Sequence, residues 1–255
     1  RYRDHLVHGV LDGRRLDGLR VVVDTANGAV SGLAADVLAV LGADVTAIHD
    51  EPDGININDG CGSTHPGDLQ AAVVAAGADL GLAFDGDADR VLAVDARGAL
   101  VDGDEIIAMC AIDLRERGLL AADTVVVTVM SNLGFRTGMA EHGITVIDTA
   151  VGDRYVLEAL DRGPFTLGGE QSGHVIFREL ASTGDGLLTG LFLLDLVSRA
   201  GRPLADLAAA AMTRLPQVLV NVRTSRRDPL VLEHLADDVA AAEARLGGRG
   251  RVLLR

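Results

Sequence analysis

The sequence predicts an α/β fold: two consecutive mixed or mostly parallel α/β sandwich modules of similar topology, followed by an incomplete strand–helix–strand piece. Short valine-rich runs alternate with helical stretches in the order strand, helix, strand, helix, strand, which is typical of a mostly parallel sheet. This layout occurs twice, with Val-Val-Val runs at residues 21–23 and 125–127, which indicates a duplicated module. No apolar run reaches the ~20 residues that a membrane span needs.

Composition narrows the class of protein. A chain of 255 residues has room for two ordinary domains. Its net charge of −14 argues against nucleic acid or an anionic membrane as a partner. Two distant cysteines suit a reducing, cytoplasmic compartment better than a disulfide framework. The start, Arg-Tyr-Arg-Asp, resembles neither a signal peptide nor an initiating Met, so we expect an excerpt from a longer chain.

The first module is expected over residues 1–102. Gly42 behind an alanine-rich stretch favours a helix end, and Arg97-Gly98 favours a hairpin turn. The expected elements are, in order, a polar and partly helical start (1–19), a strand (19–24), a tight turn (25–29), a helix (31–41), a strand (44–48), a long polar loop (50–66), a helix (68–76), a strand (80–84) and a hairpin (90–95 with 99–101).

The second module is expected over residues 103–214, and a third piece, too short for an independent domain, over 215–255. The second module is predicted to contain helices at 104–117, 135–142 and 154–160 and strands at 124–129, 144–147 and 165–167. The third piece is predicted to contain a strand at 218–222, a helix at 229–246 and a strand at 251–254.

Three alternating carboxylates, Asp85, Asp87 and Asp89, follow the apolar strand at 80–84. On an extended strand such carboxylates sit ~6.6 Å apart, too wide to hold one ion, so the chain is expected to curl here. Curled, they supply the hard oxygen ligands that suit Mg²⁺. The loop also follows the carboxyl end of a strand, where parallel sheets bind their ligands.

The competing interpretation of this loop is a solvated acidic turn. Three like charges at one strand end repel each other unless a cation or the neighbouring Arg90 compensates them, which favours the metal site. Two roles stay open for Arg90: it can stabilise charge on a transferring phosphoryl group, or form an ion pair that only holds the loop.

A second glycine-rich loop, residues 167–174, connects two short apolar strands. Its alternating Glu170, Ser172 and His174 are expected to face one way. A carboxylate, a hydroxyl and an imidazole can together bind sugar hydroxyls and phosphate. The alternative is a glycine-rich hairpin whose polar side chains bind nothing. The predicted metal site elsewhere in the chain favours the interpretation that this loop binds a ligand.

Asp153 and Arg154 stand at the predicted start of a helix. Asp153 is expected to cap that helix. Arg154 can hold phosphate beside the free backbone N–H groups of the helix N-terminus. A purely structural role for Arg154 stays open.

Three motifs together resemble those of the α-D-phosphohexomutases: Phe-Asp-Gly-Asp-Ala-Asp-Arg at 84–90, Gly-Glu-Gln-Ser-Gly-His at 169–174 and Val-Gly-Asp-Arg-Tyr-Val at 151–156. The likeness covers nearly the whole chain and is strongest to bacterial members that act on aminosugars. Since the family has four domains, the resemblance implies that the two modules are its second and third domains. Residues 215–255 then begin its C-terminal phosphate-binding domain.

The resemblance also implies a chemistry. Asp85, Asp87 and Asp89 would bind Mg²⁺, while Glu170 and its two partners in the second loop would contact the sugar phosphate. A phosphoserine would transfer its phosphoryl group through a bisphosphorylated sugar, interconverting glucosamine 6-phosphate and glucosamine 1-phosphate for amino-sugar and peptidoglycan precursor synthesis. The oligomeric state stays open, a homodimer included.

Two family motifs are absent from the sequence, the Ser-His-Asn-Pro serine loop and the Ser-Gly-Thr phosphate loop. We therefore expect the missing N-terminal and C-terminal domains of the same polypeptide to be required partners. Phosphoryl transfer depends on positioning and charge neutralisation from both sides, so these 255 residues alone are expected to be inactive.

Three rival functions remain. A phosphomannomutase or phosphoglucomutase would share the aspartate loop, although Gln171 and the Val-Gly-Asp-Arg motif favour the aminosugar. A haloacid-dehalogenase-like phosphatase would use Asp85 as nucleophile, but its usual lysine is missing because all 23 basic residues are arginines. The third is a non-catalytic module that binds Mg²⁺ or a sugar phosphate.

Overall fold

The computed structural model describes residues 2–223, 230–247 and 249–254. They separate into two compact units, one up to Thr213 and one from Arg214. The boundary predicted near residue 102 falls inside the first unit. A three-part division at residues 102 and 214 stays a prediction.

The first sheet has five strands in the order β2-β1-β3-β4-β5. β1, β2 and β3 are parallel, and β4 and β5 are antiparallel to their neighbours. The strands are β1 (Arg20–Asp24), β2 (Asp44–Ile48), β3 (Leu80–Phe84), β4 (Val91–Asp95) and β5 (Leu100–Val101).

The second sheet repeats this arrangement with four strands in the order β7-β6-β8-β9. β6 pairs in parallel with β7 and β8, and β9 is antiparallel to β8. Two modules of similar topology are therefore confirmed. The strands are β6 (Thr124–Thr128), β7 (Thr145–Thr149), β8 (Leu167–Gly169) and β9 (Val175–Phe177).

Helices connect these strands. None of those described combines the length and apolar character needed to cross a membrane. In the first unit they are α1 (Tyr2–Asp4), the π-helix η1 (His5–Val10), α2 (Leu33–Val40), the 3₁₀ turn η2 (Gly62–Thr64), α3 (Gly67–Ala76), α4 (Gly103–Glu116), the 3₁₀ turn η3 (Ala121–Asp123), α5 (Leu133–Glu141), α6 (Asp153–Arg162), α7 (Gly186–Ala200) and α8 (Leu204–Ala211).

Two of these helices, α7 and α8, were not expected from the sequence. Residues 186–197 of α7 are buried on every side, so the stretch lacks the apolar and polar faces that mark a surface helix. Its ends do carry signals. The Asp185 side chain caps the N-terminus by accepting the N–H of Leu188 at 2.9 Å, and Gly201 ends the helix in a left-handed conformation.

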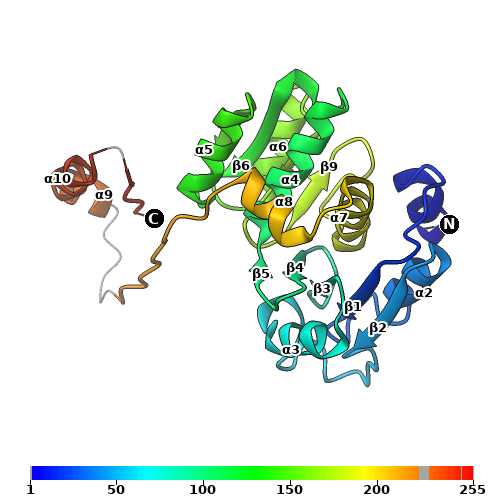
Figure 1. Ribbon diagram of the computed structural model, residues 1–255. Helices are drawn as coiled ribbons and strands as arrows, with labels where there is room; N and C mark the ends of the chain where they lie inside the picture. Colours follow the sequence, from blue (N-terminus) through cyan, green and yellow to red (C-terminus); the bar gives the residue numbers. More distant parts are fainter. Residues whose placement is uncertain (1, 224–229, 248, 255) are drawn as a thin grey trace. The chain divides into compact units, whose positions relative to one another are not determined.

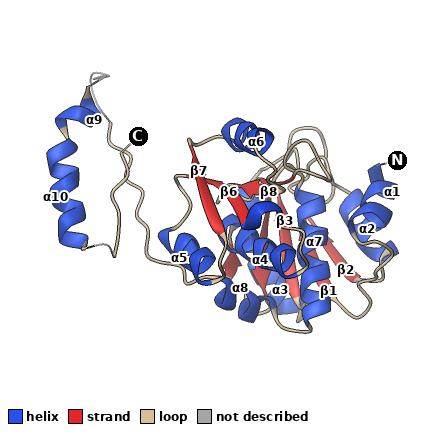
Figure 2. Cartoon of the chain, turned by 90° about the horizontal axis from the view of Figure 1, so that it is seen from above, coloured by secondary structure: helices blue, strands red, loops and turns tan. Residues whose placement is uncertain are grey.

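Helices α4 and α7 lie between the two sheets (Figure 1): α4 contacts β4 and β8, and α7 contacts β3, β4 and β9. One main hydrophobic core therefore runs from the first sheet to the second. Smaller cores lie under α3 and α6 on the outer faces. Figure 2 shows α6 on one side of β6 and β7, with α4 and α5 on the other. Because both faces of each sheet are covered, the inner strands β1, β3, β4 and β6 read as nearly continuous apolar runs, whereas the edge strands β2 and β7 are partly exposed and carry polar residues.

The second unit contains α9 (Val231–His234) and α10 (Ala236–Leu246), which confirm part of the predicted helix. The expected helix start at residue 229 lies outside the described residues. The strands expected at 218–222 and 251–254 are wrong, since the described residues there form no strand. Val218 and Val220 stay exposed. A strand is stable only with a sheet neighbour and an apolar face to cover, and the described part of this unit supplies neither.

Candidate functional site

The metal loop, residues 85–90, leaves the carboxyl end of β3 and curls as the sequence predicts. Ala88 has a left-handed backbone with φ 61°, and its N–H donates to the carbonyl of Asp85 at 3.0 Å. The turn is also fixed from outside, because Ala29 donates its N–H to the carbonyl of Gly86 at 2.8 Å. The tight turn after β1 thus supports the metal loop.

The three carboxylates converge, each offering an oxygen within 4.8 Å of those of the other two. Asp85 is 9% exposed, Asp87 is exposed and Asp89 lies between these extremes. Burial raises the pKa of Asp85 to about 6, and the charges of Asp89 and Asp87 contribute in the same direction. The cluster therefore carries negative charge that the protein does not fully compensate.

These residues fit a hard divalent cation. The donor set contains oxygen alone, which suits Mg²⁺ better than a softer metal. Asp89 Oδ1 is buried and makes no hydrogen bond within the described part of the chain. A cation held by Asp85, Asp87 and Asp89 would occupy this acceptor and relieve the repulsion between the carboxylates.

Arg90 compensates part of this charge. Its Nε lies 3.5 Å from Asp89 Oδ1 and 3.8 Å from Asp85 Oδ2, and its backbone N–H donates to Asp85 Oδ1 at 3.1 Å. The side chain remains 44% exposed. The ion pairs that hold the loop are thus formed, and the guanidinium stays accessible from solvent.

His174 is buried, with 2% of its surface exposed. Its Nε2 accepts the N–H of Gly184 at 3.1 Å, which places the proton of the neutral imidazole on Nδ1. Nδ1 lies 3.1 Å from Asp89 Oδ2. Both ring nitrogens are therefore engaged inside the protein, one of them with a predicted metal ligand.

Glu170, Ser172 and His174 differ in exposure, so they do not present one shared face to solvent. Ser172 is exposed, whereas Glu170 is half-buried and its Oε1 accepts the N–H of Gly152 at 2.9 Å. The chain turns between these residues, since Gly173 has φ 92° and donates its N–H to the carbonyl of Glu170 at 3.0 Å. The side-chain alternation of an extended strand does not apply in such a turn.

The two candidate loops hold equivalent places in the two modules. The metal loop joins β3 to β4. The predicted sugar-binding loop, here called the sugar loop, joins β8 to β9 and comprises residues 170–174, because residues 167–169 of the expected loop belong to β8. The two strand pairs occupy matching positions in their sheets. The loops also meet. Val91 donates its N–H to the carbonyl of Gly173 at 3.1 Å, close to the pair of His174 and Asp89. The structure thus brings the two predicted loops into direct contact.

Arg154 stands apart from this contact. It is the second residue of α6, whose N-cap is Gly152 instead of the expected Asp153. Its Nε pairs with Glu158 Oε1 at 2.8 Å, and its side chain is 75% exposed. The start of α6 reaches the sugar loop through the backbone N–H of Gly152, which Glu170 accepts.

Sequence reasoning missed several participants. Gly152 and Gly184 act through backbone N–H groups, for which a sequence carries no side-chain signal. It also missed a second cluster of Asp24, His49 and Cys61. Asp24 ends β1 and His49 directly follows β2, so the tendency of ligands to bind beyond the carboxyl ends of parallel strands could have indicated both.

Comparison with known families gives two matches. Residues 1–98 match the α/β/α domain II of the phosphoglucomutase/phosphomannomutase family, and residues 102–215 match its α/β/α domain III. Together the matches cover both loops and every strand of the two sheets except the short β5, which falls between them.

Curated relatives include phosphoglucosamine mutases. That of Frankia alni is 61% identical over 100% of this chain and 56% of its own length. That of Thermobifida fusca is 57% identical over 100% of this chain and 56% of its own length. The chain therefore spans about half the length of the curated relatives that it matches.

Solved structures share the fold. A phosphoglucomutase/phosphomannomutase family protein from Burkholderia thailandensis is 29% identical, with a TM-score of 0.73 over 82% of this chain and 46% of its own. N-acetylphosphoglucosamine mutase of Aspergillus fumigatus, solved in complex with GlcNAc-6P and magnesium, is 21% identical. Its TM-score is 0.75 over 94% of this chain and 57% of its own.

Proposed function

The chain belongs to the phosphoglucomutase/phosphomannomutase family, and we propose that it provides the metal loop and the sugar loop of a mutase that interconverts glucosamine 6-phosphate and glucosamine 1-phosphate. The observation that carries this proposal is the contact between the two loops. Through His174 and Asp89, a three-carboxylate cluster is fixed against a polar loop able to bind a sugar.

Magnesium is the proposed cofactor. Asp85, Asp87 and Asp89 would hold it, which is supported by their oxygen-only donor set and by Asp89 Oδ1, which is buried and accepts no hydrogen bond in the described part of the chain. When bound, Mg²⁺ supplies positive charge that neutralises oxygens of a phosphoryl group in transfer.

Other residues of the chain would bind the substrate or position the metal ligands. Arg90, exposed beside the carboxylates, would direct its guanidinium at the phosphoryl oxygens. Glu170 and Ser172 would orient the sugar through its hydroxyl groups. For His174, which was expected to contact the sugar phosphate, the occupied ring nitrogens support a positioning role. Arg154, exposed and paired with Glu158 through Nε, would bind a substrate phosphate with its guanidinium.

The phosphoserine nucleophile is proposed to lie elsewhere in the polypeptide. The sequence contains no Ser-His-Asn-Pro loop, while the relatives extend well beyond the matched region. Transfer through a bisphosphorylated sugar needs that serine, so the 255 residues alone would exchange no phosphoryl group.

The aminosugar is favoured by the relatives, since several that match the full chain at 55–61% identity are named phosphoglucosamine mutases. A phosphomannomutase or phosphoglucomutase is the alternative within the family. Both alternatives would use the same metal loop, so only substrate preference separates them.

The test measures isomerisation of glucosamine 6-phosphate, glucose 6-phosphate and mannose 6-phosphate by the complete polypeptide that contains this sequence. We expect the highest kcat/KM for glucosamine 6-phosphate, and a raised KM in Glu170→Gln but not in Glu158→Gln, whose side chain lies on α6. Release of inorganic phosphate without isomerisation would establish a phosphatase and overturn the proposal. Turnover by the 255-residue chain alone would place the nucleophile within it.

A further inference from the structure

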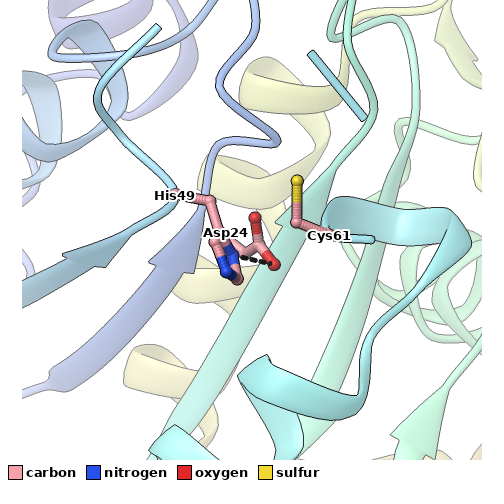
Figure 3. A group of neighbouring side chains, drawn as sticks. All are labelled: Asp24, His49 and Cys61. Carbon is pink, nitrogen blue, oxygen red and sulfur yellow. Dashed lines mark ion pairs between the residues drawn. The ribbon is translucent and has the colours of Figure 1, made fainter. Parts of the chain in front are cut away.

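A second group of metal-ligating side chains lies in the first module, away from the three aspartates. Asp24 is the last residue of β1, His49 directly follows β2, and Cys61 precedes η2 at the end of the long polar loop. Figure 3 shows the three side chains gathered around the Asp24 carboxylate. One donor atom from each lies within 4.8 Å of the other two.

Asp24 is held firmly at the centre of this group. Its side chain is fully buried. Oδ1 accepts the N–H of Ala26 at 3.0 Å, and Oδ2 accepts the N–H of Gly62 at 2.9 Å. A buried carboxylate with both oxygens fixed by backbone donors is a preorganised ligand.

His49 is oriented by carboxylates on both sides. Nε2 lies 3.3 Å from Asp68 Oδ2, and Nδ1 lies 3.1 Å from Asp24 Oδ2. Nδ1 is buried and forms no hydrogen bond in the part of the chain that the structure describes. A histidine that ligates a metal usually directs its other ring N–H at a carboxylate, as Nε2 is placed to do here with Asp68.

This arrangement leaves two acceptors facing each other. With the ring proton on Nε2, Nδ1 of His49 and Oδ2 of Asp24 both present lone pairs at 3.1 Å. A cation between them would turn this repulsion into attraction. Two arrangements without a metal compete with this one: a neutral ring with its proton on Nδ1, directed at Asp24, and a doubly protonated imidazolium between Asp24 and Asp68.

Cys61 decides which cation the group suits. Its side chain is fully buried, and it adds a soft sulfur donor to the nitrogen and oxygen of the other two. A mixed N, O and S set is typical of Zn²⁺ and other transition metals, and unsuited to Mg²⁺. Ligand atoms around a tetrahedral Zn²⁺ lie about 3.3–3.6 Å apart, so closing the group around an ion needs shifts of about 1 Å.

We propose that Asp24, His49 and Cys61 bind one transition-metal ion of the Zn²⁺ type. With three protein ligands and a fourth position left for water, the ion would tie the ends of β1 and β2 to the long polar loop. Gly62, next to Cys61, packs so closely on the carbonyl of Phe84 that it leaves no room for a side chain. Because Phe84 directly precedes Asp85, an ion that holds Gly62 against Phe84 would also help to fix the position of the metal loop. The proposal stands independently of the mutase activity.

The test titrates the chelator-treated 255-residue protein with Zn²⁺ against a chromophoric chelator, and with Co²⁺ as a spectroscopic substitute. We expect one tightly bound equivalent, and in the cobalt form a near-ultraviolet band from thiolate ligation. Cys61→Ser should lose that band and weaken Zn²⁺ binding by more than ~10-fold. Asp68→Asn, which alters only the partner of His49, should weaken it by ~10-fold.

Matched controls separate this site from others. Cys110→Ser removes the other thiol, buried in α4, and should leave Zn²⁺ affinity and the cobalt band unchanged. Asp87→Asn should do the same, because it alters only the three-aspartate cluster. Circular dichroism of each variant checks that it is folded.

Three results would overturn the proposal. They are no stoichiometric Zn²⁺ binding by the folded protein, a cobalt complex without a thiolate band, and binding that Cys61→Ser leaves intact. The first would favour one of the two arrangements of His49 without a metal. Loss of binding in Asp87→Asn alone would assign the ion to the other cluster.

Discussion

His174 Nδ1 lies 3.1 Å from Asp89 Oδ2, and this pair joins the sugar loop of one module to the metal loop of the other. Gly184 anchors the opposite side of the imidazole with its N–H at 3.1 Å. Because the ring is buried and held from both sides, it has little freedom to turn. Metal binding and sugar binding are therefore expected to be coupled through His174.

Two substitutions at His174 separate its two contacts. The amide nitrogen of Asn can replace Nδ1 toward Asp89, and the amide oxygen of Gln can replace Nε2 toward Gly184. We expect His174→Gln to weaken Mg²⁺ binding ~10-fold, since Asp89 loses the donor that orients it. His174→Asn should keep Mg²⁺ affinity and lose about 1–2 kcal/mol of stability, because the N–H of Gly184 loses its acceptor.

Isothermal titration with Mg²⁺ and urea denaturation measure these two quantities on the same samples. Equal Mg²⁺ affinities in the two variants would show that the contact with Asp89 does not position the metal ligand.

Asp87 should affect metal binding without affecting the fold. It is exposed, and its charge contributes to the raised pKa of Asp85. In Asp87→Asn we expect unchanged or slightly higher stability without metal, since repulsion in the loop falls. Stabilisation by Mg²⁺ should disappear, whereas at 100 times Kd it would amount to about 2.7 kcal/mol in the unmodified protein.

Thermal melts with and without Mg²⁺ check this prediction, with Asp44→Asn, an exposed acid at the start of β2, as control. If Mg²⁺ raises the melting temperature of Asp87→Asn as much as that of the unmodified chain, Asp87 is not a ligand.

The fold could be predicted where a segment's own sequence pattern matches the surroundings it has in the folded protein. The strands for which bounds were predicted agree with the structure within about two residues, and the plainest local signal comes from the apolar runs of β1, β3 and β6, which are covered on both faces. Helix α7 was missed because burial on every side removes its amphipathic period. The strand expected at 218–222 failed because sheet formation needs a neighbouring strand.

The candidate site also combines features set by local sequence with features set by residues distant in sequence. The spacing of Asp85, Asp87 and Asp89 is a local property that indicates a shared site, although the turn that brings them together also depends on the distant Ala29. The direction of His174 is set by Asp89 and by Gly184, both distant in sequence. No local pattern contains that information.

The contact between Tyr2 and Asp185 predicts that the stability of the fold depends on pH in alkaline solution. The hydroxyl oxygen of Tyr2 lies 2.9 and 2.8 Å from the two carboxylate oxygens of Asp185 and donates its single proton to that carboxylate. Burial raises the pKa of Tyr2, and the charge of Asp185 and this hydrogen bond raise it further. The folded state thus favours the neutral phenol. The resulting stability is fully present below the unfolded pKa of about 10 and is lost as pH rises toward the folded value.

Alkaline difference spectroscopy measures this directly. The chain has two tyrosines, so we expect part of the tyrosinate signal to appear only at a pH well above 10, and Tyr2→Phe to remove that late component. The stability of Tyr2→Phe should also depend less on pH above 10. A late component that persists in Tyr2→Phe would contradict the assignment.

Gly103, the first residue of α4, tests how closely the sugar loop packs against that helix. A Cβ there would strike backbone atoms of the loop, the N of Gly173 at 2.6 Å and the carbonyl oxygen of Gln171 at 2.7 Å. Backbone cannot rotate aside as a side chain can, so Gly103→Ala should displace the loop and cost about 1–3 kcal/mol. Gly67→Ala is the matched control, since Gly67 is likewise the first residue of a helix, α3, and a Cβ there meets nothing within 4 Å.

Gly67→Ala should be neutral or stabilising by up to about 1 kcal/mol, because alanine favours helix over glycine. Urea denaturation gives both stabilities, and titration with glucosamine 6-phosphate reports on the displaced loop. If the loop binds the sugar, Gly103→Ala should weaken that binding and Gly67→Ala should not. Weakened sugar binding in both variants would mean that the effect does not arise from displacement of the sugar loop. Equal free energies of unfolding would mean that the loop accommodates the added Cβ without strain.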